Sequence, residues 1–290
     1  MKIKNRKSCP VCGGGDIKHF INTVETHGKK VAGTKKKYNY LRCLKCEAIF
    51  LNEVTLENEI YRKHYLSIDE NCGFIKSNIE NIYSYMNNSA KKWLIFSFVK
   101  KRKKKSILDI GCGNGLFLNS FSDDWEKYGT DLLKNKRIKG GGHVKYLYGD
   151  VLKINFKKRY FSAITMWHVL EHISDPVKLL NKSRKFLRKN GCLFLSTPNS
   201  SSYGMSLGKE NWFHLDAPRH LVIYNKRSIQ ALLERTGYHI IKEVYYPFEF
   251  PLDLYWSIRK SRCRHAIYLL YPIFKLFDKE TIVYVLKRKK

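Results

Sequence analysis

Long apolar runs are missing from this sequence, and proline and acidic residues are scarce. No stretch approaches the roughly 18 apolar residues of a membrane-spanning helix, since the most apolar segment, residues 266–277, contains Pro272 and Lys275. The first ten residues are charged and no apolar segment follows them, so we expect no secretory signal and a cytoplasmic location. With 7 proline, 18 glycine and 43% hydrophobic residues, the composition excludes a collagen-like or disordered chain and indicates a globular protein.

The shortage of acidic residues leaves a large positive charge. The 290 residues include 55 basic and 25 acidic ones, which gives a formal charge of +30. Such an excess indicates nucleic acid, an anionic membrane or an acidic substrate as a partner. Forty of the basic residues are lysine, however. Proteins that recognise nucleic acid favour arginine, which makes bidentate hydrogen bonds to bases and phosphates. Lysine bias can also come from AT-rich coding, so the charge alone does not assign a partner.

Four of the eight cysteines form two Cys-x-x-Cys pairs. Cys9 and Cys12 make the first pair, and Cys43 and Cys46 make the second, with 30 residues between the pairs. Two such pairs complete the four-sulfur shell of a structural zinc site. A thioredoxin-like redox pair is the alternative, but it does not explain two pairs around a hairpin-like segment. We therefore expect a small zinc ribbon over residues 1–55, in which the ion organises the fold without catalysing.

A glycine turn follows a short apolar strand expected at residues 106–110. It reads Asp-x-Gly-x-Gly-x-Gly from Asp109 to Gly115, and a helix is expected to begin at Leu116. A strand, a glycine turn and a helix start place backbone N–H groups where a ligand approaches closely. The nicotinamide-type Gly-x-Gly-x-x-Gly is absent, because Leu116 stands at its third glycine. The Asp109 carboxylate suits a ligand with a cationic amino group and would repel a pyrophosphate.

Two further carboxylates end the next expected strands. Asp131 lies 20 residues after Gly111, where an acidic side chain binds ribose hydroxyls, and Asp150 ends a strand at 144–150, where it suits an adenine amino group. Helical segments alternate with more strands, expected at 161–166, 191–197, 238–246 and 281–286. This alternation predicts an α/β fold over residues 106–290: a doubly wound, mostly parallel, seven-stranded Rossmann-like sheet. Residues 56–105, which end in a basic run, are expected to form a helical linker.

These motifs resemble those of the class I S-adenosylmethionine-dependent methyltransferases over residues 106–246. The segments on which this resemblance rests are Asp109–Gly115, Asp131, Gly149–Asp150 and Met166–His172. The segments 43–51 and 212–221 are similar to a narrower group, bacterial methyltransferases of glycans and small molecules with an amino-terminal zinc-binding region. The resemblance implies an antiparallel last strand between strands five and six. It also implies that S-adenosylmethionine binds at Asp109, Gly111, Gly113, Asp131, Asp150, Val151 and Trp167.

The segment His168-Val-Leu-Glu171-His172 has two interpretations. It matches the His-x-x-Glu-His pattern of inverted zinc peptidases, but that pattern needs an established helix, and Asp175-Pro176 interrupts one here. The resemblance instead places the segment in the loop under the donor's sulfonium. There Glu171 and His172 either shape the pocket or fix the loop.

Ionisable and aromatic side chains crowd the segment after the fifth strand. Residues 197–204 are expected to be irregular, and Trp212, His214, Asp216, Arg219 and His220 follow within nine residues. Such a segment is typical of a loop that covers a substrate, here named the lid (residues 199–221). Neutral imidazole can take a proton from an acceptor hydroxyl, so we expect His214 or His220 to be the base. Asp216 or Arg219 would orient it or bind an acidic substrate. The alternative is that these histidines only hold the lid together.

Residues 247–280 form an aromatic insertion before the last strand, with basic residues at Arg259, Lys260, Arg262 and Arg264. It is either a buried cap over the substrate or an element that lies on an anionic membrane surface.

The sequence thus predicts a methyltransferase that acts on a small molecule or a glycan or glycolipid intermediate, at oxygen, with a structural zinc ion. RNA methylation is the alternative, favoured by the charge and the ribbon. Against it, residues 166–168 read Met-Trp-His, where enzymes that methylate base nitrogens carry an Asn/Asp-Pro-Pro-aromatic motif and base-carbon methylases a Pro-Cys pair. A zinc-ribbon binding module on an inactive fold is a third hypothesis, disfavoured because the donor motif is complete.

Overall fold

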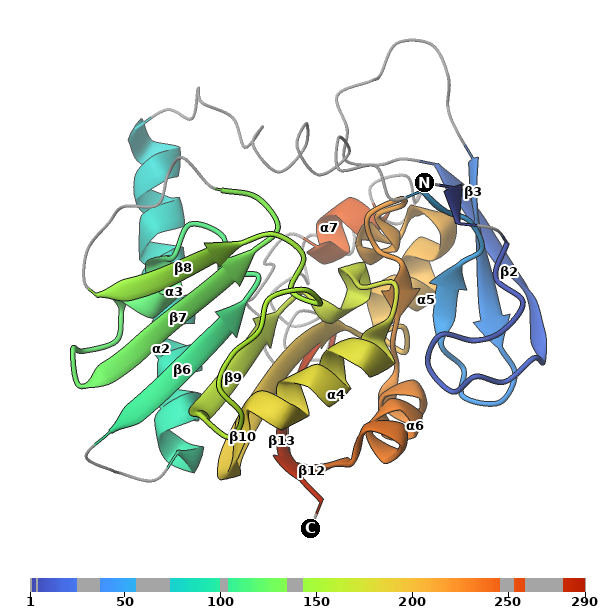
Figure 1. Cartoon of the computed structure of the whole chain (residues 1–290). Helices are drawn as coiled ribbons and strands as arrows, with labels where there is room; N and C mark the ends of the chain where they lie inside the picture. Colours follow the sequence, from blue (N-terminus) through green and yellow to red (C-terminus); the bar gives the residue numbers. More distant parts are fainter. Residues whose placement is uncertain are drawn as a thin grey trace.

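The main sheet has seven strands. The computed structural model describes residues 2–3, 5–24, 37–55, 74–99, 104–134, 143–245, 253–258 and 279–289. The strands follow the order β12-β13-β10-β9-β6-β7-β8 (Figure 1). Their bounds are β6 (Lys105–Ile110), β7 (Trp125–Asp131), β8 (Val144–Tyr148), β9 (Phe161–Trp167), β10 (Leu187–Pro198), β12 (Tyr238–Tyr245) and β13 (Thr281–Arg288).

The sheet has the predicted direction pattern. Strands β6 to β10 pair in parallel, whereas β13 pairs antiparallel with both β10 and β12. The expected doubly wound α/β sheet, with its antiparallel strand between the fifth and sixth, is therefore confirmed. The strand order reverses between β6 and β9, and the carboxyl ends of strands beside such a reversal are where open α/β sheets bind ligands.

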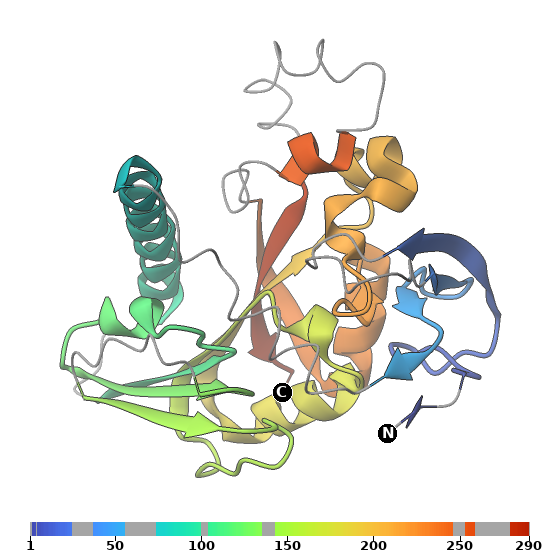
Figure 2. The ribbon, with the colours of Figure 1, turned by 90° about the horizontal axis from the view of Figure 1, so that it is seen from above.

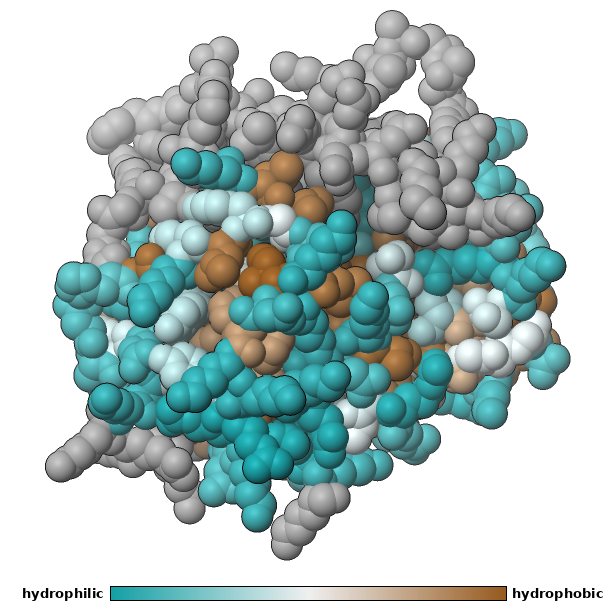
Figure 3. All heavy atoms as spheres, viewed as in Figure 1, coloured by the Kyte–Doolittle hydropathy of each residue, from teal (hydrophilic) through white to brown (hydrophobic). Residues whose placement is uncertain are grey.

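Alternating side chains give the sheet two buried faces. Ile107 packs on one face with α2 (Phe74–Phe98) and α3 (Leu116–Asn119), and its neighbour Leu108 packs on the other with α4 (Pro176–Phe186) and α6 (Lys226–Thr236). Figures 1 and 2 show α2 and α4 on opposite sides of the sheet. The outer surface seen in the view of Figure 1 is mostly hydrophilic, with apolar side chains gathered near its middle (Figure 3).

The amino-terminal strands form a second sheet, which also includes a short strand that directly follows the lid. Its order is β11-β4-β3-β2, where β2 is Ile17–Val24, β3 is Lys37–Cys43, β4 is Ile49–Leu51 and β11 is Val222–Ile223. Two more short strands, β1 (Lys2–Ile3) and β5 (Val54–Thr55), pair antiparallel with each other, and in the sequence they precede β2 and follow β4. Phe50 of β4 and Trp212 of the lid belong to one continuous core, so the ribbon and the lid are packed as one body.

The lid is more regular than expected. Residues 197–204 were predicted to be irregular because serine, asparagine and glycine favour turns, but β10 continues to Pro198 and helix α5 (Tyr203–Gly208) begins within the segment. Ser202 caps that helix by accepting a hydrogen bond from the Met205 N–H at 3.1 Å. Short 3₁₀ helices follow, η2 (Lys209–Asn211) and η3 (Phe213–Leu215), and another, η1 (Leu170–His172), follows β9.

Several expectations fall on residues outside the described ranges. They include the helical linker at residues 56–73 and 100–103 and the basic residues at 259–264, and only α7 (Asp253–Ile258) and residues 279–280 of the expected insertion are described. Within the described ranges, no helix is long and apolar enough to cross a bilayer.

Candidate active site

A buried carboxylate marks the middle of the sheet's carboxyl edge. Asp109 is the penultimate residue of β6 and is 2% exposed. Thr165 on β9 is directly opposite, and its hydroxyl donates to Oδ1 of Asp109 at 2.6 Å. Burial raises the pKa of Asp109 to about 7, although the Thr165 hydrogen bond and the positive charge of Lys91 act in the opposite direction. The site therefore holds a carboxylate that an approaching cation would help to ionise.

The glycine turn lies close against the neighbouring loop. Gly111 has a φ of 76°, which favours glycine, and a Cβ there would lie 2.4 Å from Cγ2 of Val169. The Gly113 N–H donates to Oδ2 of Asp131 at 2.9 Å. The turn thus fixes both the loop after β9 and the carboxylate that ends β7.

The predicted donor-site residues all lie at the ends of adjacent strands. Asp131 ends β7, Trp167 ends β9, and Asp150 and Val151 follow β8. Asp150 accepts a hydrogen bond from the Leu152 N–H at 2.9 Å, which folds its side chain over the turn. The structure thereby gathers Asp109, Gly111, Gly113, Asp131, Asp150, Val151 and Trp167 along one edge of the sheet.

A lysine that sequence reasoning missed reaches this edge from helix α2. Lys91 is only 8% exposed, and its Nζ lies 4.7 Å from the ring centroid of Trp167. Its charge also acts on Asp109. No sequence signal distinguishes Lys91, because it is one of 40 lysines in the chain.

The loop after β9 carries a buried charge network. His168 has a left-handed φ of 54°, and its Nδ1 bonds Oε1 of Glu171 at 3.1 Å while its Nε2 bonds the Ser196 hydroxyl at 3.1 Å. Glu171 is 0% exposed. Burial acts to raise the pKa of Glu171, but the hydrogen bond from His168 and the charge of that imidazole when it is protonated outweigh the effect of burial and lower this pKa to about 2. Glu171 is therefore a carboxylate.

The lid histidines are more deeply buried than a surface loop would suggest. His214 is 2% exposed and His220 is 7% exposed. Nδ1 of His220 donates to the carbonyl of His214 at 2.7 Å, and Nε2 lies 3.9 Å from Oδ2 of Asp216. Burial and the nearby His172 lower the pKa of His220 to about 3. Its ring is thus neutral, as expected, but is a weaker base than an exposed histidine with a pKa near 6.5.

Two buried residues outside the lid, Glu280 and Tyr40, hold the lid in place and were not predicted from the sequence. Trp212 donates from Nε1 to Oε2 of Glu280 at 2.6 Å, and the same oxygen lies 3.8 Å from Nε2 of His214. The hydroxyl of Tyr40, in the ribbon, has a single hydrogen to donate and lies within hydrogen-bonding distance of two lid carbonyls, those of Leu215 and His220, the second at 2.7 Å. These contacts join segments that are far apart in sequence, so no local pattern could have indicated them.

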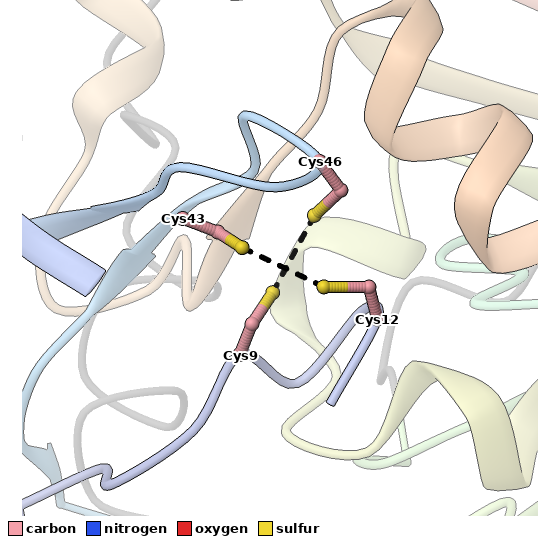
Figure 4. Close-up of side chains that lie close together, drawn as sticks. All are labelled: Cys9, Cys12, Cys43 and Cys46. Atoms are coloured by element: carbon pink, nitrogen blue, oxygen red, sulfur yellow. Dashed lines mark hydrogen bonds between the residues drawn. The ribbon is translucent and has the colours of Figure 1, made fainter. Parts of the chain in front are cut away.

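The sulfur atoms of the four paired cysteines point toward one another (Figure 4). The Sγ atoms of Cys9 and Cys46 lie 3.6 Å apart, and those of Cys12 and Cys43 lie 3.5 Å apart. A tetrahedral zinc ion with Zn–S bonds of about 2.3 Å separates its sulfurs by about 3.8 Å. The four thiols therefore have the chemistry and nearly the spacing of a closed zinc shell.

A comparison with known families identifies the chain. A family model described as "Methyltransferase domain" matches residues 83–243, more than half of the chain. The chain belongs to this methyltransferase family. The match begins after the cysteine pairs and includes the whole carboxyl edge from Asp109 to Trp167.

Individual relatives of the methyltransferase agree with this assignment. Proteins named "Ubiquinone biosynthesis O-methyltransferase" from Coxiella burnetii and Pelagibacter ubique are 25% and 26% identical to it, each over 52% of this chain and over 72% and 71% of their own lengths. The crystal structure of an S-adenosylmethionine-dependent methyltransferase from Archaeoglobus fulgidus matches 71% of this chain and 94% of its own, with a TM-score of 0.51 and 18% identity, which is a likeness of fold. The protein is an S-adenosylmethionine-dependent methyltransferase.

Proposed function

We propose that this methyltransferase transfers a methyl group to an oxygen atom of a small molecule or of a glycan or glycolipid intermediate. The alignment of Asp109, Asp131 and Asp150 along one sheet edge, within the family match, carries the proposal. Small-molecule acceptors and oxygen are supported by the names of the relatives from Coxiella burnetii and Pelagibacter ubique.

Each donor-site residue has a distinct proposed role. S-adenosylmethionine, when bound, supplies an electrophilic methyl group on a sulfonium. The Asp109 carboxylate would bind the donor's ammonium group, Asp131 its ribose hydroxyls and Asp150 its adenine amino group. Backbone groups of Gly111 and Gly113 would approach the donor closely, because neither residue has a side chain. Val151 and Trp167 would flank the donor as apolar walls.

The lid would supply the acceptor side of the reaction. As the acceptor oxygen forms its bond to the methyl carbon, the bond from that carbon to sulfur breaks and the hydroxyl proton must leave. We place His214, Asp216 and His220 at this step: the carbonyl of His214 accepts from Nδ1 of His220 and orients its ring, and Asp216 lies on the Nε2 side of the ring. The Nε2 lone pair of His220 can serve in two exclusive ways: it accepts the proton, or it binds a metal ion that makes the hydroxyl more acidic.

The cysteine cluster is proposed to hold a structural zinc ion. All four ligands would be thiolates, so no coordination position remains for water or substrate. The ion would fix the ribbon, which in turn holds the lid through Tyr40 and β11. We propose residues 1–55 as the ribbon, 56–105 as the linker and 106–290 as the methyltransferase domain.

A direct assay tests the function. The protein is incubated with S-adenosylmethionine and, separately, with phenolic small molecules, glycolipid extract and RNA, and methylated products are detected by mass spectrometry. We expect O-methylated small molecules or glycans with the wild type, and less of them with Asp131→Ala when the donor concentration is below saturation. Methylated RNA, with binding that weakens steeply as salt rises, would support the alternative instead.

The role of the lid histidines needs a separate measurement. Replacing His220 by Ala should lower turnover by about 10²- to 10⁴-fold if its lone pair takes part in the reaction, while donor affinity stays unchanged. Near-normal turnover of both His220→Ala and His214→Ala would show that these histidines only hold the lid.

A further inference from the structure

Three side chains from two separate segments converge between η1 and the end of the lid. Glu171 and His172 belong to η1, and His220 precedes β11. A carboxylate oxygen of Glu171 and one ring nitrogen of each histidine lie within 4.8 Å of one another. The Leu221 N–H donates to the carbonyl of Glu171 at 2.7 Å, so backbone hydrogen bonding holds the two segments together. From this cluster we infer that Glu171, His172 and His220 form a second metal site, for a divalent transition-metal ion.

The hydrogen bonds of both histidines prepare them as ligands. Nδ1 of His172 bonds the carbonyl of Arg219 at 3.0 Å, and Nδ1 of His220 bonds the carbonyl of His214 at 2.7 Å. A carbonyl oxygen can only accept, so each Nδ1 carries the proton and each Nε2 carries the lone pair. Histidines that bind metals almost always donate their other N–H to a carbonyl or carboxylate in this way. Both rings thus present the ligand form.

The carboxylate is prepared in a similar manner. Oε1 of Glu171 is bonded by Nδ1 of His168 at 3.1 Å. Oε2 is buried and, among the residues that the structure describes, has no hydrogen-bond partner. A buried oxygen without a partner destabilises the folded protein, and more so when the oxygen is charged. A bound cation would remove this cost.

The ligand set indicates the class of metal. Two imidazoles and one carboxylate suit zinc, iron and similar transition metals, whereas calcium and magnesium prefer sites made of oxygen. Metal–ligand bonds of about 2.1 Å need the three atoms to approach to about 3.4 Å, so the side chains must close slightly on the ion. His172 is only half-buried, which leaves room for this adjustment.

Three protein ligands leave at least one coordination position open. Closed structural zinc sites use four protein ligands, whereas catalytic ones keep a position for water or substrate. The cysteine cluster is of the first kind, and the Glu171 cluster is of the second. That the open position takes an acceptor oxygen rests on the proposed methyl transfer, whereas metal binding itself does not.

Counting bound metal tests the site without any need for turnover. The full chain is saturated with Co²⁺, freed of unbound ion on a desalting column and analysed for total metal per chain. We expect two metal ions in the wild type and one in Glu171→Gln, whose amide keeps the size of the side chain and still accepts from His168. The ion lost in the variant should show the weak visible absorption of nitrogen and oxygen ligands, without the intense bands of cobalt–thiolate bonds.

Further variants guard against loss of the fold. His172→Gln removes a ligand at a less buried position and should also retain one ion, whereas His239→Ala, at an exposed histidine, should retain two. In titrations, Glu171→Gln should weaken Co²⁺ binding at this site at least ~100-fold, the upper end of the effect of losing an outer-shell partner. A metal count in either ligand variant that equals the wild-type count would overturn the proposal. A failure of the methyl-transfer assay would leave these counts unchanged.

Discussion

Donor binding should depend on pH through Asp109. Its pKa of about 7 belongs to the protein without a donor, and the donor's ammonium group would pair with the ionised carboxylate. Binding therefore favours ionisation, lowers this pKa and releases a proton. An acid with a pKa of about 7 is half ionised at pH 7 and about 9% ionised at pH 6. Lowering the pH from 7 to 6 should thus weaken S-adenosylmethionine binding about fivefold.

Isothermal titration calorimetry measures this effect directly. Titrations at pH 6 in two buffers with different ionisation enthalpies should show the release of close to one proton per donor bound. Asp109→Asn keeps the shape of the side chain and should bind the donor more weakly, with no pH dependence between pH 6 and 7. Lys91→Met removes the nearby positive charge, so the pKa of Asp109 should rise and the pH dependence should move to higher pH.

Two results would refute this reasoning. A wild-type affinity that is constant from pH 6 to 7 would mean that Asp109 is already ionised, or that it does not contact the donor. A pH dependence that persists unchanged in Asp109→Asn would assign the titrating group elsewhere.

Three other substitutions test separate parts of the structure. Gly111→Ala should lower the free energy of unfolding by about 2–4 kcal/mol in urea denaturation, since it combines a left-handed backbone with a clash against Val169, whereas Gly15→Ala in open space should change it little. Asp131→Ala should weaken donor binding in calorimetry by about 1–3 kcal/mol, and an unchanged affinity would contradict its role. Cys43→Ser should release one zinc ion, as measured by metal analysis, and should destabilise the ribbon. The affinity for the donor should not change, because the ribbon, where the structure describes it, packs on the lid and not on the glycine turn. Well-folded wild-type protein that contains no zinc would exclude the zinc site.

The grouping of the residues proposed to bind the donor could be predicted because their positions are set by local chain geometry. A strand followed by a glycine turn places Asp109 at the carboxyl edge whatever surrounds it, and the spacing to Asp131 follows from the length of one helix–strand unit. The cysteine pairs could be predicted for the same reason, because the two cysteines of each pair are only three residues apart in the chain. Topology then brings these local features together without further information.

The acceptor side could not be predicted in the same way. Its geometry depends on contacts between distant segments, such as Tyr40 with the lid carbonyls and Trp212 with Glu280. The sequence indicated a neutral His220 but not that burial would lower its pKa and so its basicity, because burial depends on the distant segments that pack around it. The helix at α5 was missed for a more local reason: serine is common both in turns and at helix caps, and Ser202, within the segment expected to be irregular, is a helix cap.

The pairing of β11 with β4 has a consequence for how the enzyme could open. Val222 and Ile223 hydrogen-bond alongside Phe50 and Ile49, only two residues after His220. A lid that swung away by itself would tear these backbone hydrogen bonds and expose apolar side chains to water. Moving the ribbon together with the lid would in turn break the contacts of the ribbon with helix α6, such as the hydrogen bond from Arg235 to the Val11 carbonyl. The end of the lid is therefore held between the ribbon and the main domain, and a zinc ion in the cysteine cluster would stabilise its closed position by keeping the ribbon folded.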